Sequence, residues 1–310
     1  MDRRLVRRIG WLIALGCFAW VIWQFARRGE WQQVATFAHV AVLVRWMLLA
    51  IPVYVIGLCA LSVAWWCIQR SMSATSYPSF ATIFPVYATT QFAKYLPGNV
   101  GQYVGRHVLL RRWGFSHATL LVATLAEAGM LLMAATVIAA PGLDRFFPGV
   151  WKPSSVQLLV VEAILLVAGV LFLRAVARRH RRFRNLLPLE SPAWLIPVLP
   201  LHLFFFAIMA LTTMLPAHAI GMGARDVWLL PSVTAASWIA GFLVIGAPGG
   251  LGVREATFLV LLRGTLPETD ILVLAAAFRV ATFAGDGAFF LLGLATRAVH
   301  KTPAEATGSP

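Results

Sequence analysis

Pro97-Gly98-Asn99-Val100-Gly101 interrupts an apolar segment, residues 78–112, and a similar run, Pro248-Gly249-Gly250-Leu251-Gly252, interrupts a second one at 227–264. Proline lacks a backbone donor and glycine tolerates a positive φ, so the chain turns sharply at such a pair. A broken backbone survives at membrane depth only when it is buried in protein or lines a wet cavity. The two runs therefore predict a pair of broken, re-entrant hairpins.

The rest of the sequence has the composition of a membrane protein. Of 310 residues, 60% are hydrophobic and 12% are charged, and the mean hydropathy is +0.78. Soluble domains carry about a quarter charged residues, and a membrane helix needs roughly 20 apolar residues. We expect an all-α polytopic protein without a separate soluble domain, whose six spans are 9–26, 46–68, 117–140, 155–177, 194–214 and 270–296.

Positive charge is concentrated next to the predicted spans, and the net charge is +14. Arginines lie before the first span, between residues 174 and 184, and after the last span, where Lys301 follows. The positive-inside rule places these clusters in the cytoplasm, although Arg27 and Arg28 do not fit. We predict a bacterial inner-membrane protein with both termini cytoplasmic and no nucleic-acid partner. Residues 298–310 are predicted to be a disordered tail.

The two halves of the sequence correspond to each other. The Pro-Gly runs are 151 positions apart (97 to 248), and the spans of each half begin at similar offsets. Each half reads span, span, broken hairpin, span. Because three spans reverse the orientation, residues 9–140 and 155–297 are predicted to be inverted repeats within one transmembrane domain, residues 1–297. Paired interrupted segments indicate the central site of a transporter. The alternative is coincidence, since Pro-Gly is common in membrane loops.

No catalytic or metal-binding pattern stands out. The three cysteines are dispersed through apolar stretches, and the seven histidines lack the spacing of metal ligands. No Ser–His–Asp or Cys–His grouping is visible either. The sequence implies no metal and no cofactor.

The Pro-Gly runs themselves are the candidate binding site. A half-helix that begins inside the membrane presents free N–H groups and the positive end of its dipole to an anion. A nearby arginine adds bidentate hydrogen bonds to a phosphate. The alternatives are structural kinks and arginines that snorkel to the interface. The predicted substrate-binding residues are Pro97, Gly98, Gly101, Gln102, Arg106, Pro248, Gly249, Gly252, Arg254 and Glu255.

Two ionisable residues lie deep in predicted spans at equivalent positions of the halves. Glu127 and Arg279 are 152 positions apart and have apolar neighbours. Charges at such depth usually face the protein interior and mark a functional site. We expect them to face the pseudo-two-fold axis and to pair as a gate, or alternatively as a purely structural salt bridge. Asp286 is predicted to lie near the same helix face as Arg279 without touching it.

Three blocks resemble a known family: KYLPGNVGQYVGRHVLLRRWG (94–114), APGGLGVREATFLVLL (247–262) and FRVATFAGDGAFFLLG (278–293). They resemble a bacterial flippase-like family related to the transmembrane part of lysylphosphatidylglycerol synthase. The resemblance implies lipid translocation rather than aminoacyl transfer, because no synthase domain follows residue 297. Many relatives carry an acidic residue where this chain has Gln102, so the resemblance leaves the headgroup preference open.

The sequence as a whole thus favours a lipid transporter. Its partners would be an anionic phospholipid or a polyprenyl-phosphate-linked sugar, and envelope-biosynthesis enzymes are a further candidate class. One alternative is a membrane-embedded lipid-modifying enzyme that uses Glu127 or Glu255 as general base. Another is a non-catalytic subunit of an envelope glycosyltransferase system.

Overall fold

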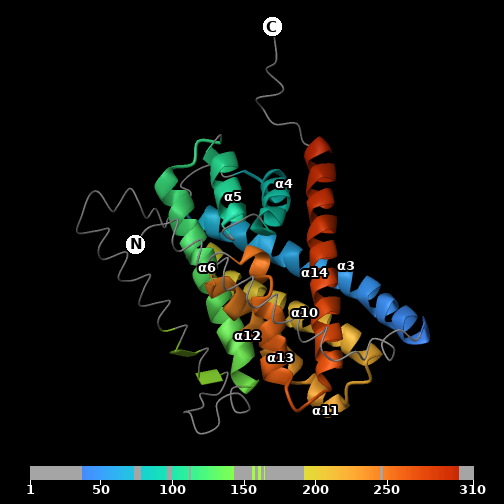
Figure 1. Cartoon of the computed structure of the whole chain (residues 1–310). Coiled ribbons are helices and arrows are strands. Elements are labelled where there is room, and N and C mark those ends of the chain that lie inside the picture. Colours follow the sequence, from blue (N-terminus) through green and yellow to red (C-terminus); the bar gives the residue numbers. More distant parts are fainter. Residues whose placement is uncertain are drawn as a thin grey trace.

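The computed structural model describes residues 37–72, 78–95, 100–111, 113–142, 192–244 and 247–299, with isolated positions between 156 and 164. Within these ranges the fold is helical, and β-structure is limited to one isolated bridge, Arg263 to Leu266. The predicted all-α class is confirmed for this part of the chain (Figure 1). Its helices are α3 (Phe37–Ser71), α4 (Phe80–Gln91), η1 (Phe92–Tyr95), α5 (Gly101–Arg111), α6 (His117–Ala139), η2 (Ala140–Gly142), η3 (Pro192–Leu195), α10 (Val198–Ala219), α11 (Ala224–Val227), α12 (Leu230–Leu243), η4 (Pro248–Gly250), α13 (Val253–Leu262) and α14 (Glu268–Val299).

Five helical stretches of the described residues are long and apolar enough to cross a membrane. Four of them contain predicted spans: Val40–Ser71, His117–Gly142, Ala193–Ala219 and Glu268–Arg297. The fifth, Ala224–Leu243, falls largely inside the segment expected to form the second hairpin. Its 20 residues suffice to cross the hydrocarbon layer, so the arm before the second Pro-Gly run is longer than the sequence pattern indicated. The predicted spans 9–26 and most of 155–177 lie outside the described residues, as do the arginine clusters at 3–8 and 174–184 and all but the first two residues of the predicted tail 298–310.

Small residues allow the long helices to cross closely. A Cβ at Gly285 of α14 would lie 2.7 Å from the ring of Tyr54 on α3, and one at Gly293 would lie 2.6 Å from Ala88 on α4. One turn further along α3, Gly57 lies against Ile208 of α10. Lipid tails are as apolar as leucine, so membrane helices associate through this kind of close packing and through buried polar contacts. The sequence positions of these glycines therefore determine where α14 and α10 cross α3 and α4.

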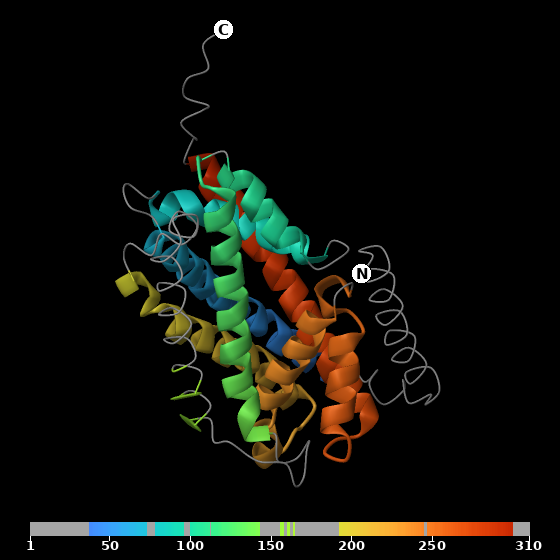
Figure 2. The same cartoon turned by 90° about the vertical axis from the view of Figure 1, so that its left-hand side faces the viewer.

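The two interrupted regions lie toward opposite ends of the described structure. The α4–α5 pair lies at the end where α14 terminates, and α11, α12 and α13 lie toward the other end (Figures 1 and 2). Helices α4, α5 and α13 have 12, 11 and 10 residues, so each is too short to cross a bilayer alone. The short elements of the two regions meet near the centre, where η1 contacts η4.

The second Pro-Gly run makes the sharp turn that the sequence predicts. Gly249, Gly250 and Gly252 have φ angles of 57°, 74° and 77°, and α13 begins at the next residue. In the first run, Pro97 and Gly98 lie outside the described residues. Helix α5 begins at Gly101, where a Cβ would collide with the backbone oxygen of Ala93. Glycine at 101 therefore lets another backbone approach.

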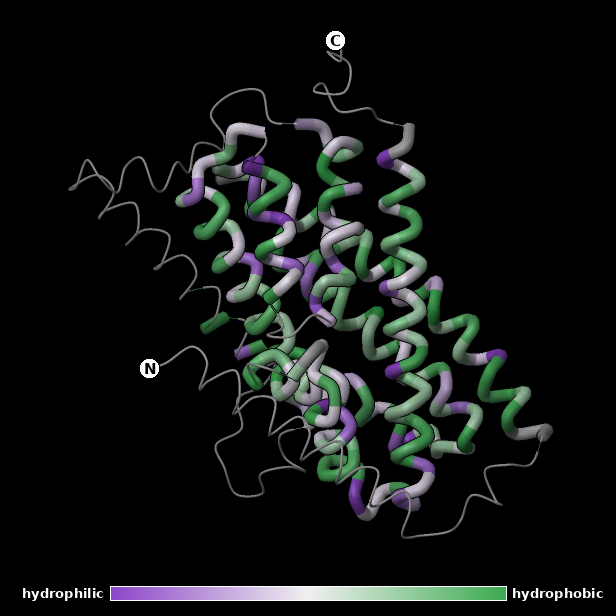
Figure 3. Tube along the Cα trace, turned by 45° about the horizontal axis from the view of Figure 1, so that its top comes forward, coloured by the Kyte–Doolittle hydropathy of each residue, from purple (hydrophilic) through white to green (hydrophobic). Residues whose placement is uncertain are grey.

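Hydrophobic residues dominate the long helices, and hydrophilic residues interrupt them at a few positions (Figure 3). Three of the charged residues among these are almost completely buried: Arg106, Glu127 and Asp286 are 3%, 1% and 0% exposed. A buried charge is costly unless it is paired and hydrogen-bonded. The arrangement of these charges identifies the candidate site.

Candidate functional site

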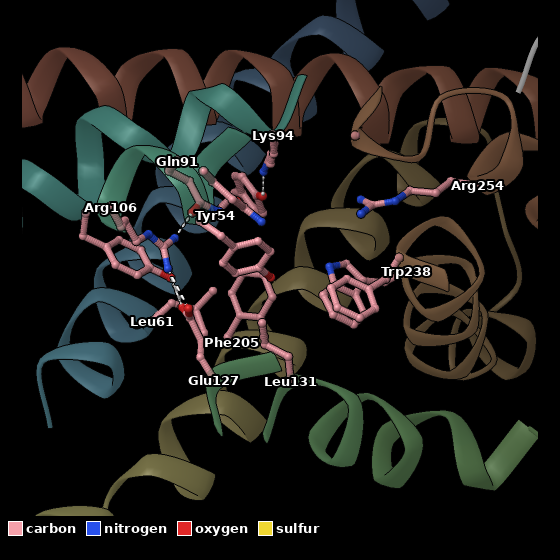
Figure 4. Close-up of a pocket in the computed structure, with 15 residues that line it drawn as sticks. Tyr54, Leu61, Gln91, Lys94, Arg106, Glu127, Leu131, Phe205, Trp238 and Arg254 are labelled. Atoms are coloured by element: carbon pink, nitrogen blue, oxygen red, sulfur yellow. Dashed lines mark hydrogen bonds and ion pairs between the residues drawn. The ribbon is translucent and has the colours of Figure 1, made fainter. Parts of the chain in front are cut away.

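A cavity lies where the two interrupted regions meet (Figure 4). It contains about 540 Å³ of empty space, including its open part. Its walls come from both halves of the chain, and most of its polar side chains come from α3–α6 and α13. The lining residues are Tyr54, Leu61, Tyr87, Gln91, Lys94, Gln102, Tyr103, Arg106, Glu127, Leu131, Phe205, Trp238, Phe242, Gly249 and Arg254.

On one wall, Arg106 of α5 and Glu127 of α6 form a buried ion pair. Arg106 Nη1 donates to both carboxylate oxygens of Glu127, at 2.8 and 2.6 Å, and Nη2 donates to Gln91 Oε1 at 2.6 Å. The hydroxyl of Tyr87 donates to the same carboxylate at 2.9 Å, and its ring lies 3.6 Å from the Arg106 guanidinium carbon. Both terminal nitrogens of Arg106 are thus already engaged by α4 and α6.

The expected pair between Glu127 and Arg279 is wrong, because each residue has another partner. Arg279 Nη1 donates to the carbonyl oxygen of Gly249 at 2.8 Å, and its Nε lies 3.6 Å from Glu255. Arg279 therefore braces the Pro-Gly turn of its own half. Equivalent positions in the two halves of the sequence did not imply contact, because each charge has another partner, Arg106 for Glu127 and Glu255 for Arg279.

A second ion pair, which the sequence analysis missed, joins the first interrupted region to α14. Lys94 Nζ lies 2.7 Å from Asp286 Oδ2 and donates to Oδ1 at 2.8 Å, and the Tyr95 hydroxyl donates to Oδ2 at 2.6 Å. As expected, Asp286 forms no ion pair with Arg279, although both reach Tyr95, whose ring lies 5.8 Å from the Arg279 guanidinium carbon. The sequence feature that could have indicated this region is its tyrosines. Four of the five in the chain lie at the site: Tyr54, Tyr87, Tyr95 and Tyr103.

Arg254 of α13 differs from the other cations at the cavity. Its side chain extends toward the cavity from the side opposite Arg106 (Figure 4). Its Nε is buried without a hydrogen-bond partner, as are Arg106 Nε and Arg279 Nη2, but unlike theirs its guanidinium makes no hydrogen bond or ion pair with any residue that the structure describes. Arg254 is only partly buried, but its guanidinium lacks a counter-ion, so an anion entering the cavity would find an unoccupied partner there.

The geometry and the sequence agree with a comparison against known families. Residues 9–289 match the family described as the lysylphosphatidylglycerol synthase TM region. The chain belongs to this family. A search of curated proteins found no match.

The match to the lysylphosphatidylglycerol synthase TM region includes both Pro-Gly runs and all the residues that line the cavity. This family is a membrane domain related to lipid flippases. Of the predicted binding residues, the structure brings Gln102, Arg106, Gly249 and Arg254 to the cavity wall. Glu255 adjoins it through Arg279, Gly101 packs against Ala93, and Gly252 precedes α13 in the turn that Pro248 begins.

Proposed function

We propose that this protein translocates an anionic lipid, either a phospholipid or a polyprenyl-phosphate-linked sugar, between the leaflets of a bacterial inner membrane. The observation that carries the proposal is the unpaired guanidinium of Arg254 in a cavity between the two interrupted regions. An arginine fork is suited to bidentate hydrogen bonds with a phosphate. Membership of a family related to lipid flippases supports the same reading.

In this proposal the two halves are inverted repeats whose broken hairpins enter from opposite membrane faces. The opposite placement of α4–α5 and α12–α13 supports it (Figure 2), and so does the contact between η1 and η4 near the centre. Transporters built this way hold their substrate where the repeats meet and expose it alternately to each side. The headgroup would pass through the polar cavity while the acyl or prenyl chains stay in the lipid.

The internal ion pairs would serve as gates rather than as ligands. Arg106–Glu127 joins α5 to α6, and Lys94–Asp286 joins the η1 segment to α14. Glu127 and Arg279 keep the gating role predicted for them, but each acts through its own partner, Arg106 or Glu255. Opening on one side would require one of these pairs to separate, while the headgroup stays on Arg254.

The test is lipid translocation by the purified protein in liposomes. The wild-type protein should accelerate movement of acyl-labelled phosphatidylglycerol, measured by quenching of the label in the outer leaflet. Arg254→Gln should slow it by about tenfold or more, since a hydrogen bond to a charged group contributes about 1.5–3 kcal/mol. Chemical conversion of the lipid would instead indicate an enzyme. If the lipid is neither moved nor converted, the result favours the accessory-subunit alternative.

Arg263→Gln is the matched control for this experiment. Arg263 directly follows α13, carries the same charge as Arg254, and has a side chain that is 78% exposed. Its loss should leave translocation close to the wild-type rate. If both variants slow translocation equally, the effect comes from general surface charge, and the assignment of Arg254 to the headgroup is overturned.

A further inference from the structure

Around the cavity, every cation except one has a carboxylate as its partner. Three cations line it, Lys94, Arg106 and Arg254, and a fourth, Arg279, binds the lining residue Gly249. Each of these except Arg254 has one carboxylate within 4 Å: Lys94–Asp286 at 2.7 Å, Arg106–Glu127 at 2.6 Å and Arg279–Glu255 at 3.6 Å. Among the described residues, the site therefore has one excess positive charge, and it is carried by Arg254.

We infer that the cavity selects a headgroup with one net negative charge, a single phosphodiester, over headgroups with none or with more. This inference rests on the proposed lipid-binding role of the cavity and narrows its substrate class. Both a glycerophospholipid such as phosphatidylglycerol and a sugar joined to a polyprenol by one phosphate have this chemistry. A sugar joined by a diphosphate carries more charge than the site neutralises.

The selection follows from the cost of an uncompensated charge in a medium of low dielectric. Two opposite charges a few ångströms apart attract more strongly inside a protein than in water, because the effective dielectric constant is lower there. A neutral headgroup leaves Arg254 without a partner. A second negative charge has no free cation among the described residues, and it gains one only by breaking a pair and stranding a carboxylate.

Tyr54 adds a neutral hydrogen-bond donor to the charged donors of Arg254. Tyr54 lines the cavity, and its hydroxyl oxygen accepts a hydrogen bond from Lys94 Nζ at 3.3 Å. The hydroxyl proton is given to no described residue, so Tyr54 can donate to a ligand while Lys94 stays on Asp286. Arg254 supplies the charged donors. A phosphodiester has two non-bridging oxygens, which these two residues can share.

Four acyl-labelled lipids test the selection with the wild-type protein. Phosphatidylcholine has no net charge, phosphatidylglycerol and phosphatidylinositol have one phosphodiester charge, and phosphatidylinositol 4-phosphate adds a second phosphate to an otherwise identical inositol headgroup. We expect phosphatidylglycerol and phosphatidylinositol to cross at similar rates. Phosphatidylcholine and phosphatidylinositol 4-phosphate should cross at least about tenfold more slowly, and tenfold corresponds to about 1.4 kcal/mol. The same order should appear in the lipid-induced rise of the melting temperature in detergent.

Two variants change the charge balance by one unit in opposite directions. Arg254→Gln removes the excess charge, so phosphatidylglycerol should lose its advantage over phosphatidylcholine. It strands no partner and should not lower thermal stability. Glu255→Gln raises the excess to two, so phosphatidylinositol 4-phosphate should gain by about tenfold relative to phosphatidylinositol. Arg263→Gln, on the exposed surface, should leave both ratios unchanged.

The outcomes separate this inference from the proposed function. Equal rates and equal binding for phosphatidylinositol and its 4-phosphate would overturn the charge selection while translocation stands. Selective binding of the singly charged lipids without movement would retain the selection and overturn the transporter. An unchanged preference in Arg254→Gln would remove this residue as its origin, and absence of both binding and movement would overturn both proposals.

Discussion

At the scale of single residues, the buried carboxylates illustrate what a sequence can and cannot predict. Glu127 stood out because an ionisable group deep in a span almost always faces the protein interior, and it is 1% exposed. Its partner could not be predicted from the sequence. Arg106 lies 21 positions earlier, and only the path of the α5–α6 connection brings it to Glu127. Arg106 was predicted to serve the substrate, yet both its terminal nitrogens bind Gln91 and Glu127.

The pairing of Arg106 with Glu127 can be measured by a double-mutant cycle on thermal stability in detergent. Glu127→Gln alone should destabilise the protein by about 3–5 kcal/mol, since it leaves a buried guanidinium without its counter-ion. Arg106→Gln alone should cost a similar amount, and the double variant should cost less than the two single costs together. The corresponding cycle between Glu127 and Arg279 should give a coupling energy near zero. A large coupling there, with none to Arg106, would contradict the arrangement described above.

At the scale of helices and turns, the sequence predicted more, because apolar length and Pro-Gly breaks are local signals. The spans at 46–68, 117–140, 194–214 and 270–296 all lie within candidate membrane helices. The predicted bounds of the second interrupted region, 227–264, were less accurate. Residues 224–243 form a stretch long enough to cross, since Pro231 lies in the first turn of α12 and does not interrupt it.

The turn before α13 supports a prediction about Gly249. Its φ of 57° favours glycine, and a Cβ there would lie 2.7 Å from the ring of Tyr95. Gly249→Ala should therefore push η4 away from η1 and reduce translocation several-fold, while the protein still inserts into the membrane. Gly264→Ala is the matched control. Gly264 also has a positive φ, 78°, but nothing lies within 4 Å of its Cβ position. Gly264→Ala therefore has the cost of placing alanine at a positive φ, roughly 1–2 kcal/mol, without any crowding of its Cβ.

Comparison of the two glycine variants separates two causes of lost activity. If only Gly249→Ala loses translocation, contact between the interrupted regions is required for transport. If both variants lose it to the same extent, backbone strain alone explains the effect. Normal translocation by Gly249→Ala would reduce the Pro-Gly turn to an ordinary bend.

At the scale of the whole molecule, the cavity could not be located from the sequence. Its walls combine α3, α4, α5, α6, α10, α12 and α13, and the crossings that bring them together depend on contacts such as Gly285 against Tyr54. The offset between the halves predicts that the Pro-Gly runs belong to one site, and this stays a prediction for Pro97 and Gly98; Tyr95, just before the first run, packs against Gly249 of the second. The Pro-Gly runs are local signals in the sequence, but the cavity with its unpaired arginine exists only because the long helices bring the two regions together.

The orientation in the membrane gives the last prediction. The α5–α6 connection and α11 lie toward opposite ends of the structure (Figure 1). The positive-inside rule places the first on the cytoplasmic side and the second on the periplasmic side. Single cysteines at His117 and Ala224, both exposed, should then report opposite sides in a variant that lacks the three native cysteines. In intact cells an impermeant maleimide should label Ala224→Cys and should reach His117→Cys only after the cells are opened. Labelling of both positions from outside would place the two interrupted regions on one face, and the two halves would then not be inverted repeats.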